Sequence, residues 1–210
     1  MSKLKSFIAA GVAVGMAMFI LAMPGKAGEV DFANPAFAPV GGQTSIPIGA
    51  SVFCKSNRTD CGVNRNVVEV MPLDEQRWAQ LVNTNNLINS AVVPVTDIDY
   101  YHSDEVWAYP TDGYGDCEDY ALAKRKALIA DGWNPSTLLM TVVREQDGDG
   151  HAVLMVRTDR GDLVLDNQDS RVLVWNQTPY QYLKRQSQAD AGRWVDLIDD
   201  RAGVMVASSK

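Results

Sequence analysis

The chain has 210 residues, of which 46% are hydrophobic, and it carries a formal net charge of −7. Nucleic acids and anionic lipid surfaces attract basic proteins, so this acidic balance argues against both as partners. The length is sufficient for one domain with a hydrophobic core of its own.

The N-terminal segment has the layout of a secretory signal peptide. Two lysines precede an apolar run over residues 7–23, and a short segment with small residues ends at Ala27. Such a segment is removed on export, so we expect residues 1–27 to be cleaved and the mature protein to have no stable insertion in a membrane. Loss of Lys3, Lys5 and Lys26 would bring the formal charge to −10. The alternative is an uncleaved anchor, because the apolar run is near the shortest that spans a bilayer.

Residues 28–65 are rich in glycine, proline, serine and asparagine, and we expect them to form an irregular N-terminal arm. Cys54 and Cys61 lie close together in this arm. In an exported protein such a pair predicts a disulfide that closes a short loop. Residues 66–210 are then expected to form the folded domain.

The folded domain is expected to begin with two helices. Apolar residues at helical spacing predict a helix over residues 73–89, with Asp74 as its N-cap. Residues 90–115 combine prolines and glycines with many aromatic residues, which is typical of a long ordered loop. A second helix is expected over residues 116–130, with Asp116 and Asp119 resembling a capping box and Asp131-Gly132 ending it.

Strands follow the helices. Runs rich in β-branched and apolar residues lie at 137–144, 151–158 and 162–166, with a fourth candidate at 171–175, and turn sequences separate them. This pattern predicts an antiparallel meander. The expected fold class is therefore α+β, with N-terminal helices packed on an antiparallel sheet.

Cys117 is the cysteine left over when Cys54 and Cys61 pair, and it falls in the first turn of the second predicted helix. A free thiol in an oxidising compartment is either buried and inert or has a chemical use. A helix N-terminus favours the thiolate, and a histidine partner favours it more. Cys117 is therefore a candidate nucleophile.

The chain has two histidines, His102 in a polar loop and His151 at the start of an apolar strand. Asp166 ends the next strand, and an antiparallel neighbour would place it near the start of the histidine strand. A carboxylate there would orient the imidazole as the third member of a catalytic triad. The alternatives are that His151 only caps a strand end and that Asp166 is a turn residue.

Carboxylates are concentrated around Cys117, at Asp112, Asp116, Glu118 and Asp119. Their charge would raise the pKa of the thiol, and a bound cation would neutralise them. Ligands that are all oxygen fit Ca²⁺ better than Zn²⁺. The spacing is not that of an EF-hand loop, so the pattern alone is a weak indication of calcium.

Three segments together resemble a known family. They are Trp107-Ala-Tyr-Pro-Thr-Asp-Gly-Tyr-Gly-Asp-Cys-Glu-Asp-Tyr120, Gly150-His-Ala-Val-Leu154 and Val164-Leu-Asp-Asn167, and they are similar to the bacterial transglutaminase-like cysteine peptidases, which include the LapG-like periplasmic protease group. The resemblance implies a papain-like or transglutaminase-like core. It also implies a triad of Cys117, His151 and Asp166, and a calcium ion held by Asp116 and Glu118 with Asp119.

The resemblance also bears on function. It implies an exported, periplasmic cysteine peptidase that cleaves a protein substrate, with a large cell-surface adhesin as a candidate substrate, a role in biofilm release and an inner-membrane regulatory receptor as a candidate partner. Two alternatives stay open from the residues. One is a transglutaminase or glutamine deamidase that uses the same triad, and the other is a calcium-responsive binding module without enzymatic activity.

Overall fold

The computed structural model describes residues 36–201. The expected signal peptide, residues 1–27, lies outside this range. Within it, no helix has the length and apolar character needed to cross a membrane. The elements in chain order are β1 Val40–Thr44, α1 Ile48–Ser56, α2 Glu75–Ala91, β2 Val93–Pro94, α3 Asp97–Tyr101, β3 Tyr114–Gly115, α4 Cys117–Ala130, η1 Pro135–Thr137, β4 Leu138–Arg144, β5 Gly150–Thr158, β6 Gly161–Leu165, β7 Leu173–Val174, η2 Trp175–Gln177, β8 Gln181–Gln186 and β9 Trp194–Leu197.

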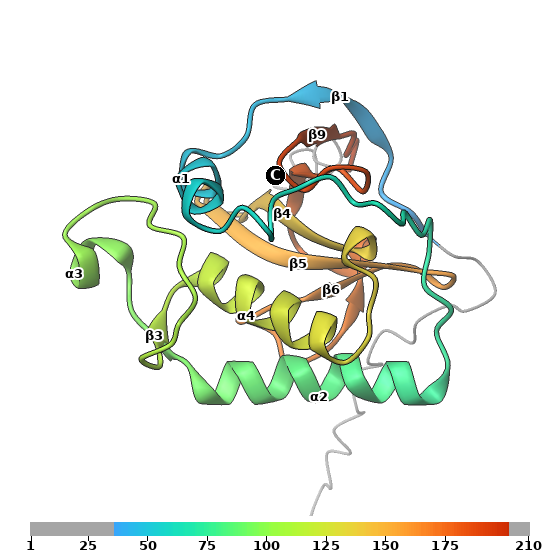
Figure 1. Ribbon diagram of the computed structural model, residues 1–210, viewed down its shortest axis with the longest axis horizontal. Helices are drawn as coiled ribbons and strands as arrows, with labels where there is room; N and C mark the ends of the chain where they lie inside the picture. Colours follow the sequence, from blue (N-terminus) through green and yellow to red (C-terminus); the bar gives the residue numbers. More distant parts are fainter. Residues whose placement is uncertain (1–35, 202–210) are drawn as a thin grey trace, which may run out of the picture.

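A seven-stranded sheet with the order β1-β9-β8-β4-β5-β6-β7 forms the centre of the molecule, and every neighbouring pair in it is antiparallel. Helix α4 packs against β5, and α2 packs against α4. Figure 1 shows the resulting layers, with α4 between the sheet and α2. The expected α+β fold, with helices on an antiparallel sheet, is confirmed.

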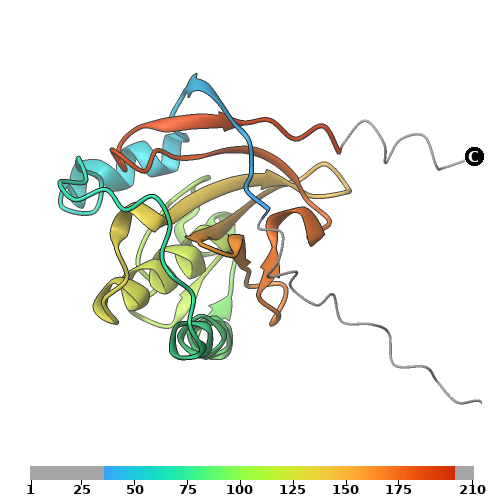
Figure 2. The ribbon, with the colours of Figure 1, turned by 90° about the vertical axis from the view of Figure 1, so that its right-hand side faces the viewer.

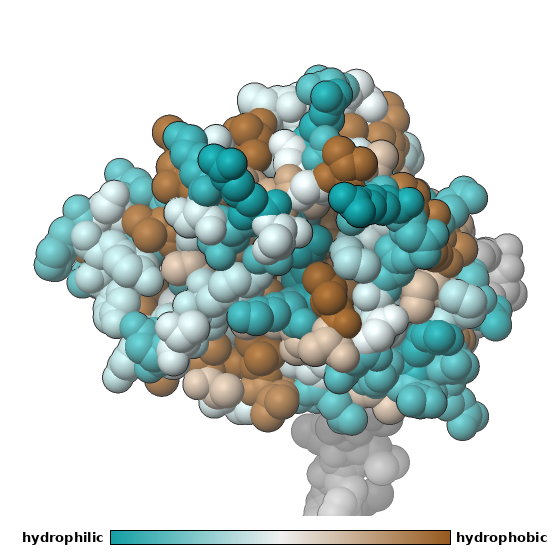
Figure 3. Space-filling view, in the orientation of Figure 1, coloured by the Kyte–Doolittle hydropathy of each residue, from teal (hydrophilic) through white to brown (hydrophobic). Residues whose placement is uncertain are grey.

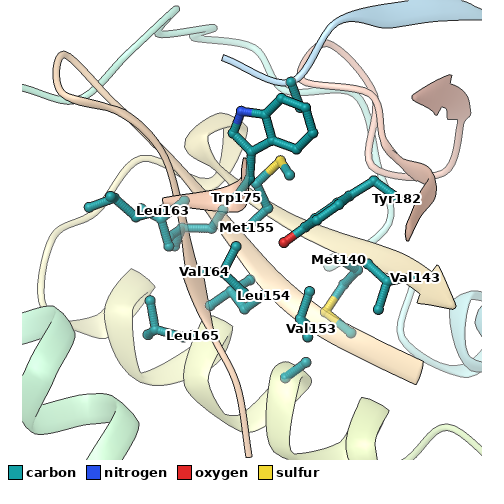
Figure 4. Packing of buried hydrophobic residues seen from close by; sticks show 14 of the residues in the cluster. Met140, Val143, Val153, Leu154, Met155, Leu163, Val164, Leu165, Trp175 and Tyr182 are labelled. Atoms are coloured by element: carbon teal, nitrogen blue, oxygen red, sulfur yellow. The ribbon is translucent and has the colours of Figure 1, made fainter. Parts of the chain in front are cut away.

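The core lies where the sheet meets α4. Residues 151–156 of β5 are all buried, so both faces of this central strand are covered. Figure 4 shows buried side chains of β4, β5 and β6 packed together with Trp175 and Tyr182. On the face of the molecule seen in Figure 3, apolar side chains are scattered among polar ones.

The two predicted helices correspond to α2 and α4 and the predicted strands to β4–β7, whereas α1, α3, β8 and β9 were not predicted. Helix α2 begins after its N-cap Asp74, whose side chain accepts a hydrogen bond of 2.7 Å from the Arg77 backbone N–H. The predicted meander is β4, β5 and β6. The expected capping box of α4 is wrong, because the Asp116 side chain makes no cap hydrogen bond and accepts one from the Asp97 N–H instead.

The segment expected to be an irregular arm is more ordered than predicted. In its described part it contains β1, which pairs with β9 at the edge of the sheet, and helix α1. Figure 2 shows β1 beside β9. The expected disulfide between Cys54 and Cys61 is present and ties α1 to the loop after it.

Candidate active site

Cys117 is the first residue of α4, and its thiol is free. The sulfur accepts a hydrogen bond of 3.4 Å from the Ala152 N–H of β5 and donates one of 3.2 Å to Glu118 Oε2. Burial raises the pKa of this thiol well above its ordinary value, and the charge of Glu118 raises it further. The arrangement described is therefore that of a neutral, protonated thiol.

His151 and Asp166 are in direct contact. His151 is the second residue of β5 and is buried, and its Nε2 lies 2.9 Å from Asp166 Oδ1. The register of the two strands explains the contact, because Leu154 of β5 faces Leu165 of β6 and Asp166 follows directly. An ionised carboxylate only accepts hydrogen bonds, so Nε2 carries the proton of this pair.

Two further donors hold the Asp166 carboxylate. The Tyr180 hydroxyl donates to Oδ2 at 2.5 Å, and the Gln168 backbone N–H donates to Oδ1 at 3.0 Å. Burial opposes the charge of Asp166, but the hydrogen bonds from His151 and Tyr180 outweigh it and hold the pKa of Asp166 below its usual range. No local pattern in the sequence connects Tyr180 with Asp166, which precedes it by 14 residues.

A second carboxylate faces the other ring nitrogen of His151. Glu145 Oε1 lies 3.7 Å from Nδ1. Gln168 Nε2 donates to the same oxygen at 2.7 Å, so Gln168 links Glu145 to Asp166. Glu145 directly follows β4, at the start of the turn before β5. The sequence did not single it out, because acidic residues beside turns are common.

The thiol and the imidazole border one cavity of about 310 Å³. Val142, Gly150, Ala152 and Glu118 line it beside the two groups, and the remaining lining residues are Pro47, Ile48, Glu105, Trp107 and Lys184. Strand β5, the start of α4 and the start of α1 therefore meet at this cavity. His102, the other histidine, is exposed at the C-terminus of α3.

A group of three carboxylates lies beside the nucleophile. One oxygen each of Asp97, Asp116 and Glu118 lies within 4.8 Å of the others. Burial, and then the charge of Asp116, raises the pKa of Glu118 to about 9, and burial is also the largest cause of the raised pKa of Asp97. Asp116 Oδ1 is buried and has no hydrogen-bond partner among residues 36–201. The group therefore places three carboxyl groups close together, and burial opposes the ionisation of Asp97 and Glu118.

The structure brings together two of the three predicted metal ligands, Asp116 and Glu118, and adds Asp97 to them. Asp119 is not in this group. Its Oδ1 accepts a hydrogen bond of 2.7 Å from the Ala108 N–H, and burial raises its pKa to about 7. Asp97 was missed because it precedes Asp116 by 19 residues, and nothing local in the sequence connects them.

Solved structures of LapG from Legionella pneumophila resemble this chain. The calcium-bound form is 28% identical over 51% of this chain, with a TM-score of 0.46, and the match spans 64% of that protein's chain. LapG without a stated treatment and EGTA-treated LapG are each 27% identical over 60% of this chain, with TM-scores of 0.49, and the matches span 71% and 73% of those chains. No curated protein matches this chain at a significant level.

A family model described as bacterial transglutaminase-like cysteine proteinase matches residues 40–202. This range includes Cys117, His151 and Asp166 and covers every helix and strand of the structure. The chain therefore belongs to the bacterial transglutaminase-like cysteine proteinases.

Proposed function

We propose that the protein is an exported cysteine peptidase in which Cys117 is the nucleophile, His151 the general acid and base, and Asp166 the residue that orients His151. One observation carries the proposal. The thiol at the start of α4 accepts a hydrogen bond from the residue next to His151, and both side chains border the same cavity. Membership of a cysteine proteinase family also supports the assignment of peptidase activity.

The proposed reaction is acyl transfer. Nε2 of His151 donates its hydrogen bond to Asp166, so Nδ1 is the ring nitrogen left to accept a proton. We therefore assign Nδ1 as the atom that takes the thiol proton. The thiolate adds to the peptide carbonyl carbon, and the C–N bond breaks as Nδ1 returns the proton to the leaving amine. Water, deprotonated by His151, then hydrolyses the thioester and releases the thiol.

The start of α4 also suits the negative charge that develops on the carbonyl oxygen. The first amides of a helix have no partner within the helix, and Cys117 is the first residue of this one. Its backbone N–H is therefore the donor that we assign to the oxyanion. The positive end of the helix dipole at the same place supports both the oxyanion and the thiolate.

We further propose that Asp97, Asp116 and Glu118 hold a calcium ion. The donor set is all oxygen, its atoms lie close enough to share one ion, and the orphaned Asp116 Oδ1 is an acceptor without a donor among the described residues. A bound divalent cation would neutralise the carboxylates beside the thiol. Glu118 is the link between the two sites, because it belongs to the acidic group and accepts the thiol hydrogen bond.

The substrate that we propose is a protein of the cell surface, with a large adhesin as the candidate, and the partner is an inner-membrane regulatory receptor. The signal-peptide layout of residues 1–27 and the family resemblance support a periplasmic location. To identify the substrate, Cys117→Ala protein would be used to trap partners from periplasmic and outer-membrane extracts. Recovery of one large surface protein that the wild type cleaves would support the assignment.

Peptidase activity is tested by mass spectrometry of cleavage products with three variants. Cys117→Ala and His151→Gln should each abolish cleavage. His102→Asn is the matched control, because His102 is the other histidine and asparagine tolerates its left-handed backbone. Full cleavage by Cys117→Ala would overturn the proposal. Ammonia release from glutamine side chains without peptide cleavage would favour transglutaminase or deamidase chemistry instead.

A further inference from the structure

Lys124 has an unusual environment for a lysine. It lies in α4, seven residues after Cys117, and is 0% exposed. Its Nζ has no hydrogen-bond partner among residues 36–201. Burial lowers the pKa of Lys124 to about 7, and the charge of Asp166 opposes this shift. Lys124 Nζ lies 5.8 Å from the centre of the Tyr120 ring. An amine buried without a hydrogen-bond partner destabilises the fold, so packing alone does not account for it.

The position of Lys124 follows from how α2 and α4 pack. The Tyr120 hydroxyl donates to the Val92 carbonyl, and Trp133 Nε1 donates to Gln80 Oε1, so the two helices run antiparallel. Lys124 lies one turn after Tyr120 and therefore faces the C-terminal half of α2. Figure 1 shows α4 alongside α2 over most of its length.

The facing part of α2 is polar and reaches the segment that carries Asp166. Asn89 Nδ2 donates to the Asp166 carbonyl at 2.8 Å, and Asn85 Nδ2 donates to the Asp169 carbonyl at 3.0 Å. The Oδ1 atoms of both asparagines are buried and accept no hydrogen bond from the described residues. Lys124 is buried in the helix that packs against this part of α2, and it is close enough to Asp166 for the two charges to interact.

We propose that Lys124 is a positioning residue for the peptidase reaction, whose buried ammonium group keeps the Asp166 carboxylate ionised and directed at His151. The inference rests on the proposed function. Three hydrogen-bond donors already hold the Asp166 carboxylate, namely His151 Nε2, the Gln168 N–H and the Tyr180 hydroxyl. Lys124 would add a positive charge, which acts on the carboxylate over a longer distance in a low-dielectric interior.

The charged and titratable groups around Lys124 determine the expected pH dependence. Asp166 follows β6, Tyr120 lies one turn earlier in α4, and His151 of β5 lies on the far side of Asp166. The facing residues of α2, Asn85 and Asn89, are uncharged. Because the pKa of Lys124 is lowered to about 7 in the folded protein, its effect on Asp166 should be largest well below pH 7 and should decline as the pH rises through about 7.

Lys124→Met is the test, and Lys126→Met is the matched control, since Lys126 is exposed on the same helix. We expect Lys124→Met to have a higher Tm than the wild type at pH 6, because methionine carries no charge to bury. The difference in Tm should shrink as the pH rises above 7, where the wild-type lysine becomes neutral. We expect kcat to fall at least tenfold at pH 6 with KM within twofold, and the ratio of wild-type to variant kcat to narrow by pH 9. Lys126→Met removes the contact of Lys126 Nζ with the Tyr109 ring, so it should leave kcat unchanged, and any change in its Tm should be the same at pH 6 and pH 9.

Two results would overturn the inference. One is a stabilised Lys124→Met protein with wild-type kcat at every pH, and the other is a destabilised protein with the same fractional loss of kcat at every pH, which indicates packing alone. A wild type no more active than Cys117→Ala would instead refute the proposed function. In that case carbon NMR of the Asp166 carboxyl tests the role of Lys124 without any activity measurement. Lys124→Met should raise the pKa of Asp166, and an unchanged titration of Asp166 would reject the positioning role of Lys124.

Discussion

Tyr180→Phe is the most informative perturbation of the site, because it removes one donor from a buried carboxylate and little else. The lost hydrogen bond is 2.5 Å long and ends on Asp166 Oδ2, and both residues are buried. A hydrogen bond to a charged group stabilises a protein by about 1.5–3 kcal/mol. We therefore expect the free energy of unfolding at pH 7 to fall by about 1.5–3 kcal/mol, measured by urea denaturation.

The sign of the pH dependence follows from the depressed pKa of Asp166. A carboxyl group whose pKa is lower in the folded state stabilises the fold above its unfolded pKa of about 3.9. This contribution is lost as the pH falls through the pKa of the folded state. Tyr180→Phe raises the folded pKa, so the stability difference from the wild type should be complete at pH 7 and shrink below about pH 4. The acid limb of the kcat/KM profile should move towards neutral pH for the same reason.

Tyr182→Phe is the control for this experiment. Tyr182 is also buried, but its hydroxyl lies 3.0 Å from Thr178 Oγ1. Its loss should lower the free energy of unfolding by about 1 kcal/mol and leave the acid limb unchanged. An unchanged acid limb in Tyr180→Phe, or an equal displacement in both variants, would refute the reasoning.

Three other predictions concern the cation group, the disulfide and the approach of α1. Asp97→Asn should weaken calcium binding by about tenfold or more, about 1.4 kcal/mol, in isothermal titration calorimetry, and unchanged affinity would remove Asp97 from the ligand set. Replacing Cys54 and Cys61 by serine opens a loop with a sequence separation of 7, and urea denaturation should show a loss of about 2–2.5 kcal/mol. Gly49→Ala would place a Cβ 2.3 Å from Trp107 Cδ1. We expect the free energy of unfolding to fall by about 1–3 kcal/mol and KM to rise. Wild-type stability would argue that α1 moves freely.

The elements that were predicted well are those whose signals are local. Helix α2 has apolar residues at helical spacing and an N-cap whose side chain bonds a residue three positions later. Strands β4, β5 and β6 are consecutive in the chain and are separated by short turn sequences. Helix α1 was missed because it is short, contains Gly49 and follows Pro47, a composition typical of a loop. Gly49 is needed there because Trp107 packs directly against its Cα. That contact is absent from any local pattern.

In the site, too, the residues that could be predicted are those with local signals. The neighbourhood of His151 and Asp166 was predictable because adjacent antiparallel strands with a short turn have few possible registers. Asp97 joins the acidic group, and Tyr180 joins Asp166, through contacts across 19 and 14 residues that no periodicity indicates. The pairing of β1 with β9 depends on residues at opposite ends of the described chain.

The sequence by itself determined the helices α2 and α4, the central meander, the Cys54–Cys61 disulfide and the candidate residues Cys117, His151 and Asp166. Helical periodicity, strand alternation with short turns, and the close spacing of Cys54 and Cys61 are local signals, and they are sufficient for these elements and the disulfide. Only the tertiary structure decided that Asp97 rather than Asp119 completes the acidic group, that Tyr180 donates to Asp166, and that Lys124 is buried. Those contacts form when distant segments pack, and burial rather than local spacing sets the charge and pKa of each group.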